Sequence, residues 1–397
     1  MEKKSFWESF KVWFGIGALL FGTYCGANMA SGAYAAGYMV TVGGGWMLVW
    51  LLMFCVFMAF FCSIGLNFVR AYGIKNYNQY YLTLWGCHKP TTNPVLKTIV
   101  SAFFDVYSIF SGLITVAATV ALFSTLMNSL FGISTFIASL GGVILFAILT
   151  VNGAGFLRKF NTVMTLSLLV CLAALLIAVI SDRGSTLFSR IGNFSEGIDW
   201  TGPNVTVGAH FAMFLSYCWS TSSWGSSLCN YAENIKTKKD AFGSGILCGL
   251  LVTFLFGVTS LIVLPYMPEA MSDAPILMIC QTYLPKFLTA VYWVVVVFSV
   301  VSTAPTFTFN MANRWAAVWK SEKVSHKTKF FVISFVYLAA AWAISQVGLM
   351  AIVQKGYVIM GNVALPAVAL PAVALPLVFS IYRVWKKDKA EKTAETA

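Results

Sequence analysis

Two apolar stretches of the sequence contain short polar segments rich in groups that can bind an ion or a small solute. Residues 22–32 read GTYCGANMASG, with three glycines, and residues 216–227 read SYCWSTSSWGSS, with seven serine or threonine hydroxyls. Glycine and short polar side chains are poor helix formers, so both segments predict an interrupted helix. Inside a membrane, the freed N–H and C=O groups of an interruption must be buried in protein or line a cavity, where they can hold a carboxylate or a cation. Close helix packing through small residues is the competing interpretation of the first segment.

A third apolar stretch, residues 95–127, places polar residues on one helical face and includes an acid. The residues of this face are Ser101, Asp105, Ser108, Gly112, Thr115 and Thr119. Asp105 is about ten residues into the stretch, roughly 15 Å along a helix. A carboxyl group at that depth indicates a function, either as a proton carrier or as the counter-charge of a substrate amine. An acid near the inner membrane surface, paired with a loop lysine, is an equally good interpretation, so both stay open.

A fourth apolar stretch, residues 285–313, carries hydroxyls that face one direction on a helix. The polar residues there are Ser299, Ser302, Thr303, Thr306 and Asn310, with Pro305 among them. Such hydroxyls can supply oxygen ligands for Na⁺. Hydroxyls that bond back to their own helix are common, and from the residues alone this second interpretation is slightly favoured.

The composition shows what positions these segments. Of 397 residues, 59% are hydrophobic and 10% are charged, and the mean hydropathy is +0.79. A soluble domain has about 25% charged residues, and a bilayer is crossed by about 20 apolar residues. The sequence therefore predicts an all-α polytopic membrane protein with about ten transmembrane helices, the first and sixth of them broken. The expected spans are 12–40, 44–69, 95–127, 132–151, 157–181, 205–231, 241–265, 285–313, 329–353 and 357–382.

The distribution of lysine and arginine gives the orientation. If the N-terminus is cytoplasmic, the outer segments hold only Arg183, Arg190, Lys286 and Lys355, so 22 of the 26 basic residues lie inside. Both termini are then cytoplasmic. This asymmetry also accounts for the net charge of +12, so a nucleic-acid partner is not expected.

The ten spans divide the chain into four parts. A first five-helix repeat covers residues 1–181, an outer loop 182–204, a second five-helix repeat 205–382, and a charged cytoplasmic tail 383–397. The inner loop 72–93 has tyrosines at near-helical spacing, which predicts an amphipathic helix at the inner surface. The repeat ALPAVALPAVALP at residues 364–376 has no functional interpretation. The sequence has no phosphate-binding loop, metal cluster or paired catalytic carboxylates, so neither an enzyme nor an organic cofactor or metal other than a coupling ion is expected.

The segment LFGTYCGANMASG, Leu20 to Gly32, resembles the first span of the amino acid–polyamine–organocation superfamily, which has the LeuT-type fold of two inverted five-helix repeats. More narrowly, it is similar to poorly characterised ten-span bacterial membrane proteins of the YkvI type. The resemblance implies a substrate site between helices one, three, six and eight. The implied lining residues are Gly26, Ala27, Asn28, Ser31, Tyr107, Ser108, Ser216, Trp219 and Ser220.

Sodium-coupled members of the superfamily hold one Na⁺ between carbonyls of the first span and a Ser/Thr pair of the eighth. The resemblance implies that these groups are the carbonyls near Gly22 and Cys25 and the side chains of Ser302 and Thr303, with Ser299 one turn before. This match raises the Na⁺ interpretation above back-bonding. Some proton-coupled relatives replace this Na⁺ with a lysine inside the fifth span. Here Arg158 and Lys159 lie at the inner end of that span and no basic residue follows until Arg183, which favours Na⁺ over that variant.

These observations lead to one hypothesis and two alternatives. The hypothesis is a secondary transporter of a bacterial cytoplasmic membrane that couples uptake of a small amino-acid-like or amine solute to Na⁺ by alternating access. One alternative is a proton-coupled transporter or exchanger that uses Asp105. The other, from a different class, is a membrane sensor that binds a solute without moving it. The sequence does not predict an oligomeric state.

Overall fold

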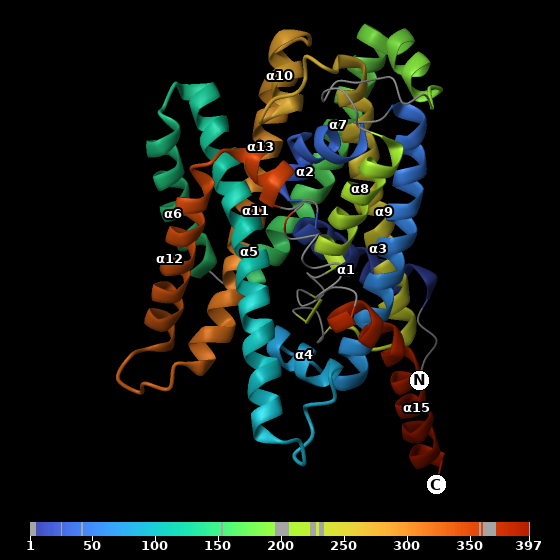
Figure 1. Ribbon diagram of the computed structural model, residues 1–397, viewed down its shortest axis with the longest axis vertical. Helices are drawn as coiled ribbons and strands as arrows, with labels where there is room; N and C mark the ends of the chain where they lie inside the picture. Colours follow the sequence, from blue (N-terminus) through green and yellow to red (C-terminus); the bar gives the residue numbers. More distant parts are fainter. Residues whose placement is uncertain are drawn as a thin grey trace.

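Helices dominate the computed structural model, and no strand occurs in the residues that it describes. The described residues are 5–24, 26–40, 43–151, 154–194, 206–222, 228–229, 234–356, 359 and 371–396. Most helices run roughly along the long axis of the molecule, and both ends of the chain lie at its lower end (Figure 1). The all-α prediction is confirmed.

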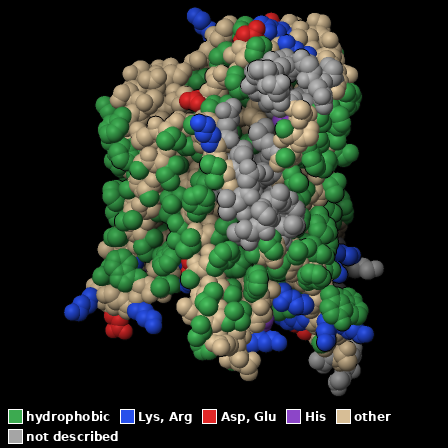
Figure 2. All heavy atoms as spheres, viewed as in Figure 1, with side chains coloured by type: hydrophobic (Ala, Val, Ile, Leu, Met, Phe, Trp, Pro, Cys, Tyr) green, Lys and Arg blue, Asp and Glu red, His purple; other side chains and the backbone are tan. Residues whose placement is uncertain are grey.

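Six helices in the described residues are long and apolar enough to cross a membrane. They are α3 (Gly44–Tyr72), α5 (Pro94–Phe131), α7 (Ala154–Ile191, apolar from Val163), α9 (Lys238–Val263, with η3, Leu264–Tyr266), α11 (Lys286–Val318) and α12 (His326–Ser345). A shorter apolar helix, α6, covers Thr135–Val151. Hydrophobic side chains cover much of the described surface between the two ends, and most lysines and arginines lie toward those ends (Figure 2). The chain is an integral membrane protein.

The first span is interrupted where the sequence predicts it. Helix α1 (Phe6–Tyr24) ends just before the short helix α2 (Ala27–Ala30). A turn follows at Gly32, whose φ of 83° favours glycine, and then comes the π-helix η1 (Ala35–Met39). In the sixth span, α8 (Val207–Ser222) is helical through the first part of the expected interruption, so residues 216–222 differ from the prediction. Residues 223–227 lie outside the described part of the chain.

Several elements have other limits than the sequence predicts. Helix α7 continues to Ile191, with a kink at Arg183, so the expected outer loop begins later than residue 182. The ninth stretch ends at Ser345, and Gly348, with φ of 89°, precedes α13 (Leu349–Ala351) and the π-helix η4 (Ile352–Gly356). A short helix, α10 (Pro275–Thr282), lies before α11.

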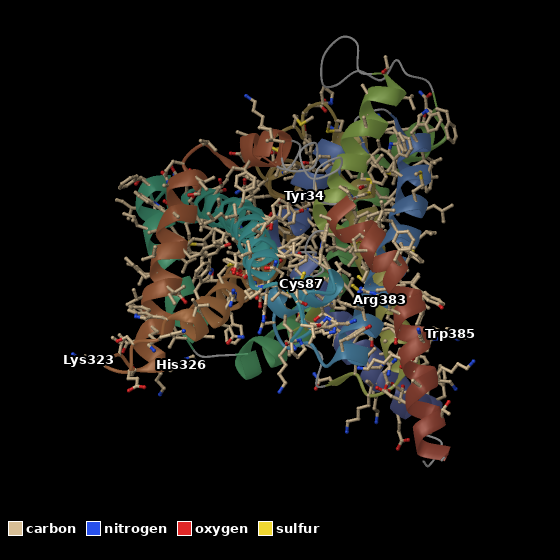
Figure 3. All side chains as sticks on the ribbon, turned by 60° about the horizontal axis from the view of Figure 1, so that its bottom comes forward. Tyr34, Cys87, Lys323, His326, Arg383 and Trp385 are labelled. Atoms are coloured by element: carbon tan, nitrogen blue, oxygen red, sulfur yellow. The ribbon has the colours of Figure 1, made fainter. Side chains whose placement is uncertain are left out.

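The expected cytoplasmic tail belongs to a helix. Helix α15 (Leu375–Thr396) continues through it and is held by Arg383, which donates a hydrogen bond to the Leu84 carbonyl at 2.9 Å. Arg383 and Trp385 lie on this helix at one side of the lower end, and Lys323 and His326 lie at the opposite side (Figure 3).

The helix expected in the inner loop is present as α4 (Tyr77–Leu84), which the Asn76 side chain caps at its N-terminus. Its tyrosines do not lie on a membrane surface, because Tyr77, Tyr80 and Tyr81 are all buried in the protein. The ring of Tyr81 stacks on Phe104 of α5 with centroids 4.0 Å apart. The near-helical spacing of the tyrosines therefore reflects packing under the long helices.

Two sets of helices make up most of the structure. Helices α1, α3 and α9 pack together and form what we call the glycine-packed group. A Cβ atom added to Gly249 of α9 would lie 2.6 Å from the backbone nitrogen of Ala59 in α3, and one added to Gly245 would overlap Ser63. Helices α3 and α9 therefore meet backbone to backbone, which small residues allow.

The second set, which we call the four-helix group, contains α5, α6, α11 and α12. Its helices meet through side chains: Trp342 of α12 donates to the Ser139 hydroxyl of α6 at 2.9 Å, and the Tyr337 hydroxyl occupies the space beside Gly112 of α5. In Figure 1 this group is on the left and the glycine-packed group is on the right. Helix α7 contacts members of both groups.

Candidate functional site

The interruption of the first span lies directly against the eighth. Gly26 is buried between α1 and α2, and a Cβ atom there would overlap the Thr303 hydroxyl oxygen and lie 2.6 Å from its methyl group. The structure thus brings together two residues that are far apart in the sequence. One belongs to the polar segment of the first span and the other to the hydroxyl-bearing face of the eighth.

Helix α1 ends at this contact. Gly22 is in the last turn of α1, where the final four carbonyls of a helix lack the partners that a continuing helix would supply. The C-terminal end of a helix is also the negative end of its dipole, which favours a cation. The Thr165 hydroxyl of α7 donates to the Ala18 carbonyl at 3.3 Å and fixes α1 from the other side. Cys25 lies outside the described residues.

The far end of α2 is held by two other elements. The Tyr292 hydroxyl of α11 donates to the Ala30 carbonyl at 3.0 Å, and the Ile276 backbone N–H donates to the Ser31 carbonyl at 3.1 Å. The Ser31 hydroxyl accepts a hydrogen bond from the Ala33 N–H at 3.2 Å. The carbonyls after the interruption are therefore occupied by protein groups.

On α11, Thr303 and Ser299 are buried, and the Thr303 hydroxyl donates to the Ser299 carbonyl at 3.0 Å. This back-bond uses the proton of Thr303, but a hydroxyl oxygen has two lone pairs that can still accept a ligand. Pro305 lies inside the helix and has no N–H to offer the carbonyl four residues earlier. Ser302 is on α11, but its side chain is not among those described.

On α5, the predicted lining residues Tyr107 and Ser108 are both buried. The Ser108 hydroxyl has no hydrogen-bond partner among the described residues, and a buried polar group left unpaired is costly. Helix α5 also contacts α2, so Ser108 belongs to a helix that faces the interruption.

The structure does not place the side chains of five predicted lining residues of the solute site or the remaining part of the sixth-span segment. Ala27 and Asn28 belong to α2, and Ser216, Trp219 and Ser220 belong to α8, but these side chains are outside the described set. Their part in the site stays a prediction.

Asp105 is not at this contact but in a separate polar cluster toward the inner end. The Arg314 guanidinium donates to both carboxylate oxygens of Asp105, at 2.9 and 3.2 Å. Arg314 also donates to the Ser101 hydroxyl at 3.3 Å, and the Asn78 side chain of α4 donates to that hydroxyl at 2.6 Å. Arg314 is 11 residues after Thr303 on α11, about 16 Å along the helix. The partner of the acid is this arginine, and not the loop lysine that the sequence suggested.

The cluster around Asp105 borders a small pocket of about 430 Å³, lined in part by Asn78, Lys97 and Trp315. Tyr77 of α4 is near the same carboxylate. Burial, and then the negative charge of Asp105, raise the pKa of Tyr77 well above its ordinary value. These groups join α4, α5 and α11 at the inner end.

Sequence reasoning missed Arg314 and Tyr292. The expected span ended at residue 313, so Arg314 was counted as a charge of an inner loop. Tyr292 gave no signal, because a single tyrosine in an apolar stretch is ordinary. An acid deep in one span together with an arginine at the end of another was the available hint for the ion pair.

No protein-family model matches the sequence, and no match is found among curated proteins. Solved structures do match. A structure of MhsT in complex with L-phenylalanine gives a TM-score of 0.64 at 13% identity, covering 88% of this chain and 86% of that one. A Na⁺-coupled sialic acid symporter in a substrate-bound outward-open state gives 0.61 at 12% identity, with coverages of 88% and 75%. A manganese transporter of Eremococcus coleocola gives 0.58 at 14% identity, with coverages of 95% and 80%.

These matches extend over most of the chain. At such low identity they establish the fold and leave the substrate and coupling ion open. The chain has the LeuT-type fold.

Proposed function

We propose that the protein is a secondary active transporter that couples uptake of a small amino-acid-like or amine solute to Na⁺ by alternating access. The observation that carries this proposal is the contact of Gly26 with Thr303. In transporters built from inverted repeats, unwound carbonyls and helix ends near the membrane midplane hold the coupling ion. Here the interrupted first span and a buried hydroxyl of the eighth span meet in that way.

The proposed Na⁺ ligands are the carbonyls of Gly22 and Cys25 and the hydroxyls of Ser299, Ser302 and Thr303. Carbonyl and hydroxyl oxygens suit a hard cation of this kind. The back-bond from Thr303 to Ser299 is the competing interpretation of this hydroxyl. It is compatible with the assignment, because it uses the proton of Thr303 and leaves oxygen lone pairs for the ion.

The proposed solute site adjoins the ion site. Its lining is formed by Gly26, Ala27, Asn28, Ser31, Tyr107, Ser108, Ser216, Trp219 and Ser220. Ser108, whose buried hydroxyl lacks a partner in the described residues, would hydrogen-bond the solute. L-phenylalanine and sialic acid, named with two of the matching structures, both carry a carboxylate, which supports an organic acid or zwitterion.

We also propose a membrane location for the protein and a division of its chain into two repeats. The protein would lie in a bacterial cytoplasmic membrane with both termini inside, and its repeats would be residues 1–181 and 205–382. The glycine-packed group would then rock against the four-helix group to expose the site to each side in turn.

Proton coupling through Asp105 is the alternative with less support. Its carboxylate accepts two hydrogen bonds from Arg314, so the acid is held in an ion pair away from the contact of Gly26 with Thr303. A solute sensor is distinguished by flux, because a sensor binds the solute and moves none.

The test is uptake into proteoliposomes that contain the purified protein. A panel of labelled amino acids and amines is offered with an inward gradient of Na⁺ or of choline. We expect at least one solute to accumulate only with Na⁺, and the Ser302→Ala, Thr303→Ala double variant to lose that dependence while remaining folded. Thr308→Ala is the control, since Thr308 is also buried on α11 and bonds back to Ala304 at 2.8 Å. Unchanged Na⁺ dependence in the double variant would remove the ion-site assignment.

A further inference from the structure

A groove of about 800 Å³ lies away from the proposed transport site, between α3, α9 and α15. Its walls are almost entirely apolar and include Phe60 and Ile64 of α3, Phe242 of α9 and Ile381 of α15. Phe60 and Ile381 are about two-fifths exposed. The groove is therefore open at the surface that faces the lipid.

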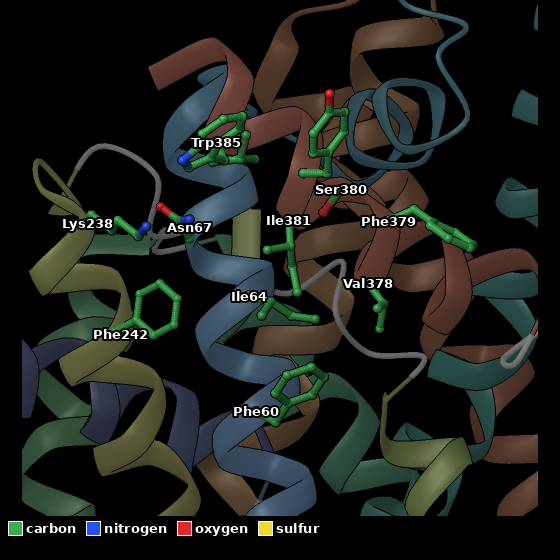
Figure 4. Close-up of a pocket in the computed structure, with 12 residues that line it drawn as sticks. Phe60, Ile64, Asn67, Lys238, Phe242, Val378, Phe379, Ser380, Ile381 and Trp385 are labelled. Atoms are coloured by element: carbon green, nitrogen blue, oxygen red, sulfur yellow. The ribbon is translucent and has the colours of Figure 1, made fainter. Parts of the chain in front are cut away.

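The polar residues of the groove are gathered at one end. Figure 4 shows Lys238, Asn67 and Trp385 together at this end, with Phe60 at the other and Ile64 between them. Along α3, Asn67 is seven residues beyond Phe60, which corresponds to about 10 Å. The groove thus changes from polar to apolar over a depth that matches the passage from a lipid headgroup into the acyl chains.

The positive charge at the polar end has no acidic partner among the residues that the structure describes. Lys238 forms no ion pair with any residue that the structure describes, and its ammonium group lies 5.8 Å from the Phe242 ring centroid. The nearest acid in the sequence, Asp240, is buried and caps its own helix by accepting from the Thr237 N–H at 3.0 Å.

Two other cations near this end have anionic partners. Arg70 of α3 is 2.9 Å from Asp388 of α15, and Lys387 is 3.7 Å from Glu391. Lys238 is the charged residue that lines the groove, and it is exposed and without an ion pair in the described part of the chain, so it can meet an outside anion. Trp385 beside it is the kind of residue that lies at the level of the headgroups.

We propose that this groove binds an anionic phospholipid of the adjacent leaflet. The phosphate would lie at Lys238, and one acyl chain would follow Phe242 and Ile64 toward Phe60. Basic pockets between transmembrane helices are sites of this kind. A lipid bound there would connect α15 to the glycine-packed group, and its binding does not depend on which solute or ion the protein transports.

Native mass spectrometry of the purified protein tests the charge requirement. The probes are a phosphatidylglycerol and a phosphatidylcholine with the same acyl chains. We expect the protein to retain the anionic lipid preferentially and Lys238→Ala to weaken that preference about fivefold, the effect of one lysine near an anionic headgroup. Lys239→Ala is the control, because Lys239 is exposed but does not line the groove. Equal retention of both lipids by the wild type, or an equal loss in both variants, would overturn the proposal.

A second pair of variants tests the groove itself. Ile381→Trp should fill it and reduce the binding of the anionic lipid, whereas Val336→Trp, at a 62% exposed position on α12, should not. The elution profile on gel filtration shows whether each variant is folded. Unchanged lipid binding in Ile381→Trp would place the lipid elsewhere. A dimer that Ile381→Trp disrupts would show that a second copy of the chain covers the groove instead.

Discussion

The glycine-packed group and the four-helix group are held together by different kinds of contact. Between α3 and α9 the contact is backbone to backbone, at Gly245 and Gly249. In the four-helix group it is made by side chains, such as the ion pair of Arg314 with Asp105 and the hydrogen bond of Trp342 to Ser139. Side chains can change rotamer, but two packed backbones can move only as a unit. The first group is therefore built as a rigid piece, and the second as one that tolerates adjustment.

The candidate site lies where the two groups meet. Gly26 contacts Thr303, and Ala30 accepts a hydrogen bond from Tyr292, so α11 touches the first span at the interruption and again at the end of α2. If one group rocks against the other, as we propose, the motion must change these contacts and preserve those inside the glycine-packed group. Substitutions in each region should accordingly affect stability and transport in different proportions.

The largest effect on stability is expected in the four-helix group from Asp105→Asn. The Asp105 and Arg314 side chains are only 10% and 19% exposed, so neutralising the acid leaves a cation largely buried without its partner. Breaking a buried pair on one side costs about 3–5 kcal/mol. Thermal unfolding in detergent should show a large fall in Tm.

Two further variants test whether the unpaired charge of Arg314 causes this loss of stability. Asp105→Asn combined with Arg314→Gln removes both charges and should recover much of the stability. Glu391→Gln breaks the pair with Lys387, in which Glu391 is 60% exposed, and should cost less than about 1 kcal/mol. If the double variant is as unstable as Asp105→Asn, the unpaired charge is not the cause.

An intermediate effect is expected in the glycine-packed group from Gly249→Ala. The new methyl group would lie 2.6 Å from the Ala59 backbone nitrogen, and the helices must separate to admit it, at about 1–3 kcal/mol. Gly257→Ala on the same helix is the control, since its nearest neighbour is a side-chain atom of Leu51 at 3.5 Å. The measurement is the Tm of both variants. An equal loss of Tm in the two would contradict a backbone contact at Gly249.

The pattern of hydrophobic residues was enough to predict that the long spans exist, but it did not predict where they end. The expected stretch 241–265 corresponds to α9 (Lys238–Val263). The stretch 157–181 was ended before a run of charges, yet α7 continues to Ile191. It can do so because Asp182 accepts a hydrogen bond from the Tyr266 hydroxyl at 2.6 Å and Arg190 donates to the Leu264 carbonyl at 2.6 Å. Such partners come from other parts of the chain, and no local pattern reveals them.

The candidate site was predictable in its parts but not in its pairings. Unusual glycines and hydroxyls drew attention to Gly26 and Thr303 separately, and the family resemblance suggested that their spans meet. The face that carries Asp105 was visible from helical spacing. The partner of Asp105 could not be predicted, because the spacing of residues in α5 does not indicate which neighbouring helix brings Arg314 to that face.

The smallest effect on stability, and the one most confined to function, is expected from Gly26→Ala at the junction of the two groups. The added methyl group would overlap the side chain of Thr303, whose hydroxyl oxygen, methyl group and Cβ all lie within 3.0 Å of it, so we expect the strain to fall on that side chain. Because the same hydroxyl is a proposed Na⁺ ligand, we expect the apparent affinity for Na⁺ in the uptake assay to fall about tenfold, or 1.4 kcal/mol. Gly15→Ala in the same helix, with no atom within 4 Å of the new methyl group, should keep wild-type affinity. Adding Thr303→Ala to Gly26→Ala should relieve the overlap and raise the Tm, but it should not restore Na⁺ dependence. If the double variant regains full Na⁺ dependence, then Thr303 limits the space at the junction but does not bind the ion.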